Sequence, residues 1–131
     1  MLDTDVVIAA LDRRDAHHRA AAQAFRRLAE EETDLLLSAV NYAESLVRPA
    51  EDERALRAAV DAIASLRIRI VPPDAAVARQ AAKNRGLGIS LADGFALATA
   101  AAHGATVASF DKRVRRALPA VNLHLCEALA S

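Results

Sequence analysis

Short apolar runs alternate with longer alanine-rich segments along almost the whole chain. The apolar runs are Leu2 with its neighbours, 35–38, 68–71, 106–109 and 121–125. The segments between them have the spacing of helices, at about 5–12, 16–32, 39–48, 51–66, 74–85 and 91–103. Apolar strands that alternate with helices are typical of a parallel sheet covered on both faces. The pattern therefore predicts an α/β fold with a small central parallel sheet of four to five strands, flanked by helices on both faces.

The composition favours the same class of fold. Hydrophobic residues make up 53% of the 131 residues but aromatic residues only 3%, so alanine, leucine and valine must fill the core. A β-sandwich would need more aromatic and β-branched residues. The length predicts a single domain over residues 1–131, large enough for a core of its own.

Charge, cysteine content and hydropathy exclude several classes of protein. Seventeen basic and seventeen acidic residues balance, so a nucleic acid must be held by a local patch or through metal ions. The single cysteine, Cys126, excludes a disulfide framework and suits a reducing compartment. No apolar stretch approaches the ~18 residues needed to cross a bilayer, and no secretory signal is recognisable. We therefore expect a cytoplasmic protein without a membrane partner.

Four acidic residues lie at or just after the ends of predicted strands, or in helices that follow them. Asp3 ends the first apolar run, and Asp111 follows the fourth, in VASFDKR. Glu44 and Asp93 lie in predicted helices, in LLLSAVNYAESLV and GISLADGFALATAAAHG. Ligands of such sheets bind at the carboxyl ends of the strands. Four carboxylates at that edge would repel each other unless a hard cation such as Mg²⁺ or Mn²⁺ lay between them, as in many enzymes that hydrolyse phosphodiesters.

Most of these acids also have an explanation that needs no metal. Ser90 and Asp93 form the pattern of a capping box, in which the aspartate only starts a helix. Asp111 fits the cap of a helix formed by KRVRRAL. Glu44 is harder to explain in this way, because at about 100° per residue it borders the apolar arc of its helix, at the edge of the core. Asp5 is expected either to cap the first helix or to support the other acids from behind.

The residues around these acids resemble a known family. The stretches LDTDVVIAAL, SAVNYAESL, ISLADGFALATAAAHGATVAS and SFDKRV are similar, in this order and over nearly the whole chain, to the PIN-domain ribonucleases, and within them to the VapC-type toxins of toxin–antitoxin modules. The resemblance implies that the catalytic acids, which hold Mg²⁺ or Mn²⁺, are Asp3, Glu44, Asp93 and Asp111. Ser109 stands where the family usually has threonine, so its hydroxyl is expected to hydrogen-bond the Asp111 carboxylate or a water. Asp5 replaces the usual serine or asparagine.

The resemblance further implies endonucleolytic cleavage of RNA, homodimerisation and inhibition by a cognate antitoxin. Two basic runs are candidates for holding RNA phosphates, one with Arg13 and Arg14 and one with Lys112 and Arg113. A solvated helix face explains each run equally well. For the dimer we expect the helices around 39–66, which have more apolar surface than one small sheet can cover. The apolar residues concerned are Leu46, Leu56, Val60 and Ile63.

Two other functions stay open at this point. A haloacid-dehalogenase-like phosphatase would use Asp3 as nucleophile and Asp5 as general acid. It also needs a lysine ahead of a late acidic pair, and Lys83 precedes no such pair. A catalytically silent PIN-like binding module would be expected to lack one of the four acids, and all four are present.

Overall fold

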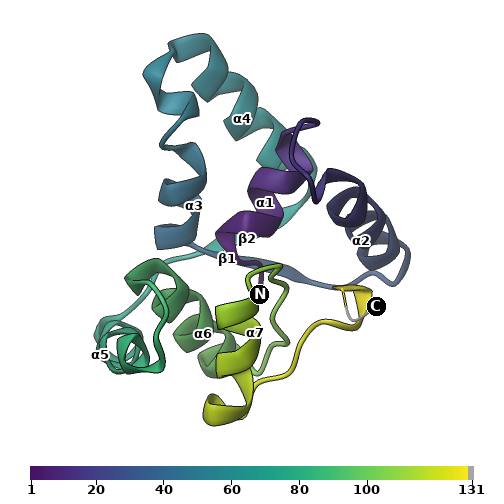
Figure 1. The fold of residues 1–131 in the computed structure, drawn as a ribbon. Coiled ribbons are helices and arrows are strands. Elements are labelled where there is room, and N and C mark those ends of the chain that lie inside the picture. Colours follow the sequence, from purple (N-terminus) through teal and green to yellow (C-terminus); the bar gives the residue numbers. More distant parts are fainter. Residues whose placement is uncertain (130–131) are drawn as a thin grey trace.

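The computed structural model of the protein describes residues 1–129 (Figure 1). Its helices and strands, in chain order, are α1 (Thr4–Leu11), α2 (His18–Glu30), β1 (Leu35–Ser38), α3 (Ala39–Leu46), α4 (Glu53–Ser65), β2 (Ile68–Val71), α5 (Ala75–Asn84), α6 (Leu91–His103) and α7 (Lys112–Ala117). Short 3₁₀ turns are η1 (Pro49–Glu51), η2 (Arg85–Leu87), η3 (Leu118–Val121) and η4 (Glu127–Leu129). The predicted α/β order of helices and strands is confirmed.

A parallel sheet lies at the centre of the molecule, but most of its strands are very short. Among the described residues 1–129, only β1 and β2 form a continuous parallel ladder. The other predicted strands are reduced to single parallel bridges, one between Leu2 and Ala108 and one between Val107 and Leu125. The amide N–H of Leu2 donates to the carbonyl of Leu36 at 2.8 Å, which joins these bridges to β1. The predicted sheet of four to five strands therefore consists of two strands and three segments that join it only through single bridges, around Leu2, around Val107 and Ala108, and around Leu125.

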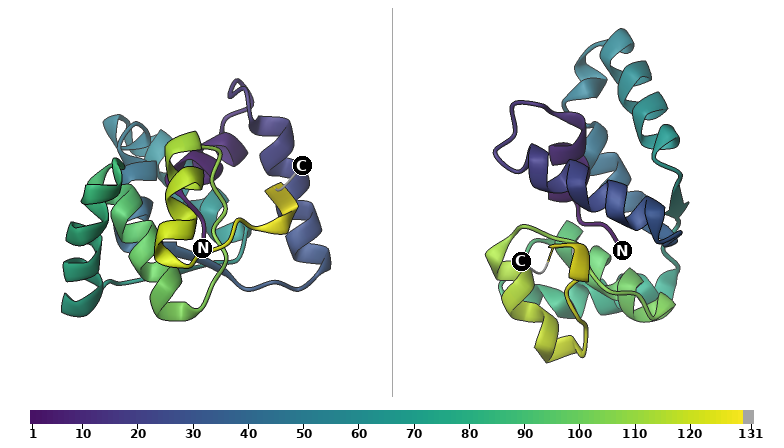
Figure 2. Two further views of the ribbon diagram at one scale, coloured as in Figure 1. Left: turned by 60° about the horizontal axis from the view of Figure 1, so that its bottom comes forward. Right: turned by 90° about the vertical axis from the view of Figure 1, so that its right-hand side faces the viewer.

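Adjacent residues of the sheet point into two different hydrophobic cores. Leu2 and Leu37 pack with side chains of α1, α2 and α4. Their chain neighbours Met1 and Leu36 pack with side chains of α6 and α7. Because alternate side chains of a strand point to opposite faces, both faces of the sheet are covered, as the apolar runs predict. Figures 1 and 2 show this division, with α1–α4 on one side of the sheet and α5–α7 on the other. Each fully buried leucine contributes about 1.5–3 kcal/mol.

The helices α5 and α6 pack with their backbones unusually close. A Cβ atom added at Gly94 of α6 would lie 2.7 Å from the carbonyl oxygen of Ala81 in α5, closer than real Cβ contacts come. Only glycine therefore fits at this point of α6. The contact fixes the first turn of α6, which carries Asp93, against the end of α5.

A groove with mostly apolar walls runs between α1, α3 and α4. Its volume is about 870 Å³, and it is lined by Ile8, Leu11, Val47 and several alanines of α4. Val47 is 66% exposed, whereas Ile63 is buried within the protein at 2% exposure. The expectation that Ile63 offers surface to a second copy is therefore wrong. Within residues 1–129, no helix has the length and apolar content to cross a bilayer.

Candidate active site

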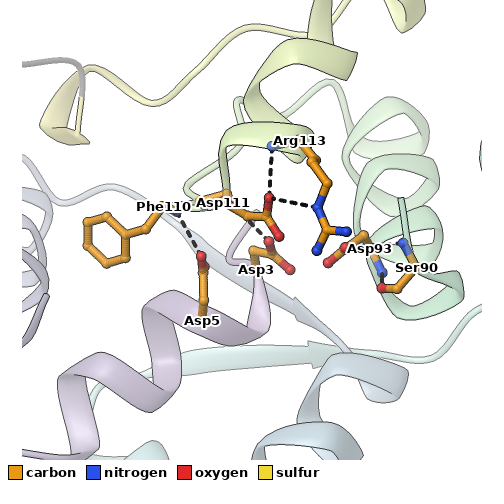
Figure 3. A network of polar contacts seen from close by, with 8 residues as sticks. Asp3, Asp5, Ser90, Asp93, Phe110, Asp111 and Arg113 are labelled. Atoms are coloured by element: carbon orange, nitrogen blue, oxygen red, sulfur yellow. Dashed lines mark hydrogen bonds and ion pairs between the residues drawn. The ribbon is translucent and has the colours of Figure 1, made fainter. Parts of the chain in front are cut away.

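Four aspartates lie close together beside the carboxyl end of the sheet (Figure 3). Asp3 caps the N-terminus of α1 and Asp111 caps that of α7. Asp5 lies in the first turn of α1 and Asp93 in the first turn of α6. Helix N-termini carry partial positive charge and free N–H groups, so each of these starts favours a carboxylate. The structure thus brings together Asp3, Asp93 and Asp111, which are three of the four acids that the sequence singles out.

Asp3 is the most buried of these acids, at 2% exposure. Its Oδ1 accepts the N–H of Thr4 at 2.9 Å, and its Oδ2 accepts the hydroxyl of Ser109 at 2.7 Å. Burial raises the pKa of Asp3 to about 8, and the negative charges of Asp5 and Asp93 act in the same direction. The two hydrogen bonds only partly offset this rise. A negative charge on Asp3 therefore destabilises the folded protein.

Ser109 connects Asp3 with Asp111. Its hydroxyl donates to the Asp3 carboxylate and accepts the backbone N–H of Asp111 at 3.1 Å. The side chain of Arg115 donates from Nε to the carbonyl of Ser109 at 2.7 Å and so fixes the backbone. The expected hydrogen bond from Ser109 to the Asp111 carboxylate is wrong, because this hydroxyl donates to Asp3 instead.

Asp5 does not cap the first helix, since Asp3 takes that place. The Oδ2 of Asp5 accepts the backbone N–H of Phe110 at 2.9 Å. Its Oδ1 is buried and has no hydrogen-bond partner among residues 1–129. Burial raises the pKa of Asp5 to about 6, and the charges of Asp111 and Asp93 add to the rise. Asp5 therefore supports the segment that carries Asp111 and adds charge to the cluster.

Asp93 forms the predicted capping box with Ser90. The N–H of Asp93 donates to the hydroxyl of Ser90 at 3.1 Å, and the N–H of Ser90 donates to Oδ2 of Asp93 at 3.3 Å. The same carboxylate is half-buried and close enough to raise the pKa of Asp3 and Asp5. Asp93 is thus both a helix cap and a member of the acidic cluster.

Arg113 is a cation beside this cluster. The Oδ1 of Asp111 accepts the backbone N–H of Arg113 at 2.8 Å, and Nε of Arg113 lies 3.7 Å from the same oxygen. In Figure 3 the guanidinium of Arg113 extends between Asp111 and Asp93. The Arg113 side chain is 71% exposed, so its ion pair with Asp111 contributes little to stability. The guanidinium can therefore move toward a bound phosphate.

Glu44 is exposed on α3 and takes no part in these hydrogen bonds. Its carboxylate has no hydrogen bond or ion pair with the part of the chain that the structure describes, and it borders the apolar groove instead. The buried face of α3 consists of Asn41 and Ser45. The expectation that Glu44 lies at the edge of the core is therefore wrong. The apolar side of this helix, which includes Val47, faces solvent instead of the core.

The acidic cluster fits a hydrated divalent cation better than a fully protein-bound one. Within residues 1–129 no three His, Cys, Asp or Glu side chains converge tightly enough to enclose a metal ion. Mg²⁺ usually keeps several waters and needs only one or two carboxylates. The donors are all oxygens, which Mg²⁺ and Mn²⁺ prefer. The Oδ1 of Asp5, unpartnered in the described chain, and the raised pKa of Asp3 both indicate that the surrounding protein stabilises a negative charge on these carboxylates poorly.

The RNA-binding candidates lie on two sides of Phe110. Lys112 and Arg113 are exposed in the first turn of α7, directly after Asp111, while Arg13 and Arg14 are exposed in the loop between α1 and α2. Sequence reasoning missed that His17, at the end of that loop, stacks on Phe110. The ring centroids are 4.3 Å apart and the rings are tilted by 8°. No local pattern links residues so distant in sequence.

Comparisons with known proteins agree with the fold. Residues 1–117 match the family model of the PIN domain. The chain is also similar to the crystal structure of FitAcB from Neisseria gonorrhoeae, with 25% sequence identity and a TM-score of 0.71, over 99% of this chain and 98% of that chain. The chain matches no curated protein.

Proposed function

Because the chain belongs to the PIN-domain family, whose members are usually nucleases, we propose that it is a metal-dependent endoribonuclease. More specifically, we propose the toxin of a type II toxin–antitoxin system, with residues 1–131 as one domain acting in the cytoplasm. The observation that carries the proposal is the buried Asp3 among three further aspartates. Such crowding of negative charge costs stability unless a cation compensates it.

In this proposal Asp3, Asp93 and Asp111 would hold Mg²⁺ or Mn²⁺. Glu44 is the fourth acid by family resemblance alone, because in this structure its side chain borders the apolar groove. A bound ion would neutralise charge on the phosphate and lower the pKa of an attacking water. Ser109 keeps Asp3 and Asp111 in a fixed relation, because one hydroxyl contacts both residues. The capping box holds Asp93 at the start of α6.

RNA reaches the acids along a surface with basic and aromatic side chains. Lys112 and Arg113 follow Asp111 directly and are placed to contact phosphates, which positions a strand without reading its sequence. On the other side, the exposed ring of His17 over Phe110 offers a face on which a base of single-stranded RNA can stack. Arg13 and Arg14 add positive charge to the same loop.

Two protein partners belong to the proposal, namely a second copy of the chain and a cognate antitoxin. The apolar groove between α1, α3 and α4 supports a protein contact, since Ile8 and Val47 are exposed along it. A small open reading frame that lies upstream and overlaps the gene is expected for the antitoxin. Finding the gene alone, with no such neighbour, speaks against the toxin assignment but not against the nuclease.

The test of the nuclease is RNA cleavage by the purified protein with Mg²⁺ or Mn²⁺ and with EDTA. We expect cleavage with metal, none with EDTA, and a strong loss in Asp3→Asn. The matched control is Asp61→Asn, which removes an exposed aspartate of α4 and should cleave like the wild type. A protein that cleaves neither RNA nor p-nitrophenyl phosphate is a silent binding module. Hydrolysis of p-nitrophenyl phosphate without RNA cleavage would favour the phosphatase.

A further inference from the structure

Two buried asparagine side chains hold the backbone on either side of Asp93. Asn41 of α3 is 0% exposed and Asn84, at the end of α5, is 2% exposed. The amide Nδ2 of Asn41 donates to the carbonyl of Ala92 at 3.2 Å, and that of Asn84 donates to the carbonyl of Gly94 at 3.0 Å. The residues before and after Asp93 are thus each fixed by a side chain from a different helix.

Asn41 also connects this turn with Asp3. The same Nδ2 donates to the hydroxyl oxygen of Thr4 at 3.0 Å. Thr4 directly follows Asp3, and its N–H donates to Oδ1 of Asp3. One amide group therefore contacts the neighbour of Asp3 and the neighbour of Asp93, although these aspartates come from α1 and α6.

Asn84 holds the opposite side of the turn from α5. Its own amide is oriented by Gln80, whose Nε2 donates to Oδ1 of Asn84 at 3.0 Å. At Gly94 the backbones of α5 and α6 are already as close as a glycine allows. The first turn of α6 therefore cannot move closer to α5, and the hydrogen bond from Asn84 opposes its movement away from α5.

Stability alone is a poor explanation for Asn41. Its Oδ1 is buried without a hydrogen-bond partner in residues 1–129, and a buried unsatisfied polar atom destabilises a fold. A leucine of similar size would fill the space without that cost. An amide is needed at this position only if its contacts with Thr4 and Ala92 matter.

We propose that Asn41 and Asn84 are positioning residues that set the separation of Asp93 from Asp3 and thereby the affinity of the acidic cluster for a divalent cation. This inference rests on the proposed function, since it names residues that tune the same site. Residues that orient metal ligands typically change metal affinity or activity by roughly 10–100-fold when they are replaced.

The variants that test it are Asn41→Leu and Asn84→Leu, which keep the volume but remove the donor. Two controls have no contact with the acids. Thr99→Val removes a buried hydroxyl of α6 that has no partner in the described chain, and Leu28→Ala weakens the core beneath α2. Each full-length protein is titrated with Mn²⁺ while the melting temperature is followed, and RNA cleavage is measured separately as kcat and KM.

We expect the Mn²⁺ concentration for half of the thermal shift to rise by roughly 10–100-fold in both asparagine variants. The value of kcat at fixed Mn²⁺ should fall while KM for RNA stays the same. Both controls should keep wild-type Mn²⁺ affinity, even where the metal-free melting temperature drops. If Asn41→Leu does not fold, Asn84→Ala carries the test, because it only truncates a side chain at the end of α5.

A folded asparagine variant with wild-type Mn²⁺ affinity and kcat overturns the positioning role and leaves the nuclease intact. If the wild type itself shows neither a Mn²⁺ shift nor cleavage, the proposed function fails and the inference fails with it.

Discussion

At the scale of single residues, Asp93 carries two roles that the sequence presents as alternatives. Its capping box with Ser90 was predictable from a spacing of three residues, and the structure contains both hydrogen bonds. Its place among the acids depends on contacts between α1, α6 and the segment before α7. A short motif predicts the first role because its partners are local, whereas the second needs the whole fold.

The variant Asp93→Asn distinguishes these roles. Asparagine can still accept the N–H of Ser90, so a pure cap predicts unchanged activity. We expect instead that the metal-free variant is at least as stable as the wild type, because one charge of the cluster is gone. Cleavage should become far slower. Mn²⁺ should raise its melting temperature less than that of the wild type, for which a hundredfold excess over Kd stabilises by about 2.7 kcal/mol.

The readout is a pair of thermal scans, with and without Mn²⁺, next to an RNA cleavage assay. If Asp93→Asn is active and Mn²⁺ raises its melting temperature as much as that of the wild type, Asp93 only caps the helix.

Asp3 predicts how the stability of the metal-free protein depends on pH. Its pKa is about 8 in the folded protein, whereas an aspartate of the unfolded chain ionises near pH ~4. Between these values the folded state binds a proton that the unfolded state has released. The free energy of unfolding should therefore fall as the pH rises from about 4 to about 8. Asp5 acts in the same direction, up to its pKa of about 6.

Melting temperatures in EDTA across this range measure the effect. The matched comparison is Asp3→Asn, which should lose most of the slope since it has no proton to bind. Equal slopes in the two proteins would show that the charge of Asp3 is not costly in the fold.

At the scale of elements, helices were easier to predict than strands. The helices at 39–48 and 91–103 were predicted within about two residues, because alanine-rich periodicity and the caps at Ser38 and Ser90 are local signals. The first strand shrinks to a bridge because Asp3 already caps a helix that begins at Thr4. The apolar runs therefore predicted where the sheet lies better than how long its strands are.

The close contact of α5 with α6 gives a prediction at this scale. Gly94→Ala places a methyl group against the carbonyl of Ala81, so the helices must separate. We expect a loss of about 1–3 kcal/mol in the free energy of unfolding, as for other overpacked sites. The control is Gly86→Ala, where a Cβ would meet nothing within 4 Å. Urea unfolding of both variants measures the difference, and equal stability of the two would contradict the close packing.

At the scale of the whole molecule, the fold class and the convergence of three aspartates could be predicted, while finer relations could not. The carboxyl ends of parallel strands lie at the same edge of a sheet, and this brings Asp3 and Asp111 to that edge. The exposure of Glu44 could not be predicted, because the buried face of α3 is polar and formed by Asn41 and Ser45. When the buried face of a helix is polar, the periodicity of apolar residues predicts that the opposite, exposed face is buried.

The groove between α1, α3 and α4 predicts where two copies of the chain meet in a homodimer. Val47 is the most exposed large apolar residue along it, so we expect this surface to be covered in a homodimer. Light scattering at micromolar concentration should give the mass of two chains, and Val47→Asp should give one. A monomeric wild type under these conditions contradicts the dimer, whereas a dimeric Val47→Asp protein would move the interface elsewhere.

The chemical ends of the cleaved RNA test the central claim most directly. If Asp3, Asp93 and Asp111 hold a divalent ion that would direct water onto the phosphorus, the products carry a 5′-phosphate and a 3′-hydroxyl. End-labelling of fragments made by the wild-type protein in Mn²⁺ distinguishes these from other ends. Fragments with 2′,3′-cyclic phosphates, formed equally well in EDTA, would mean that the ribose hydroxyl attacks without a metal, and would contradict the account of this site.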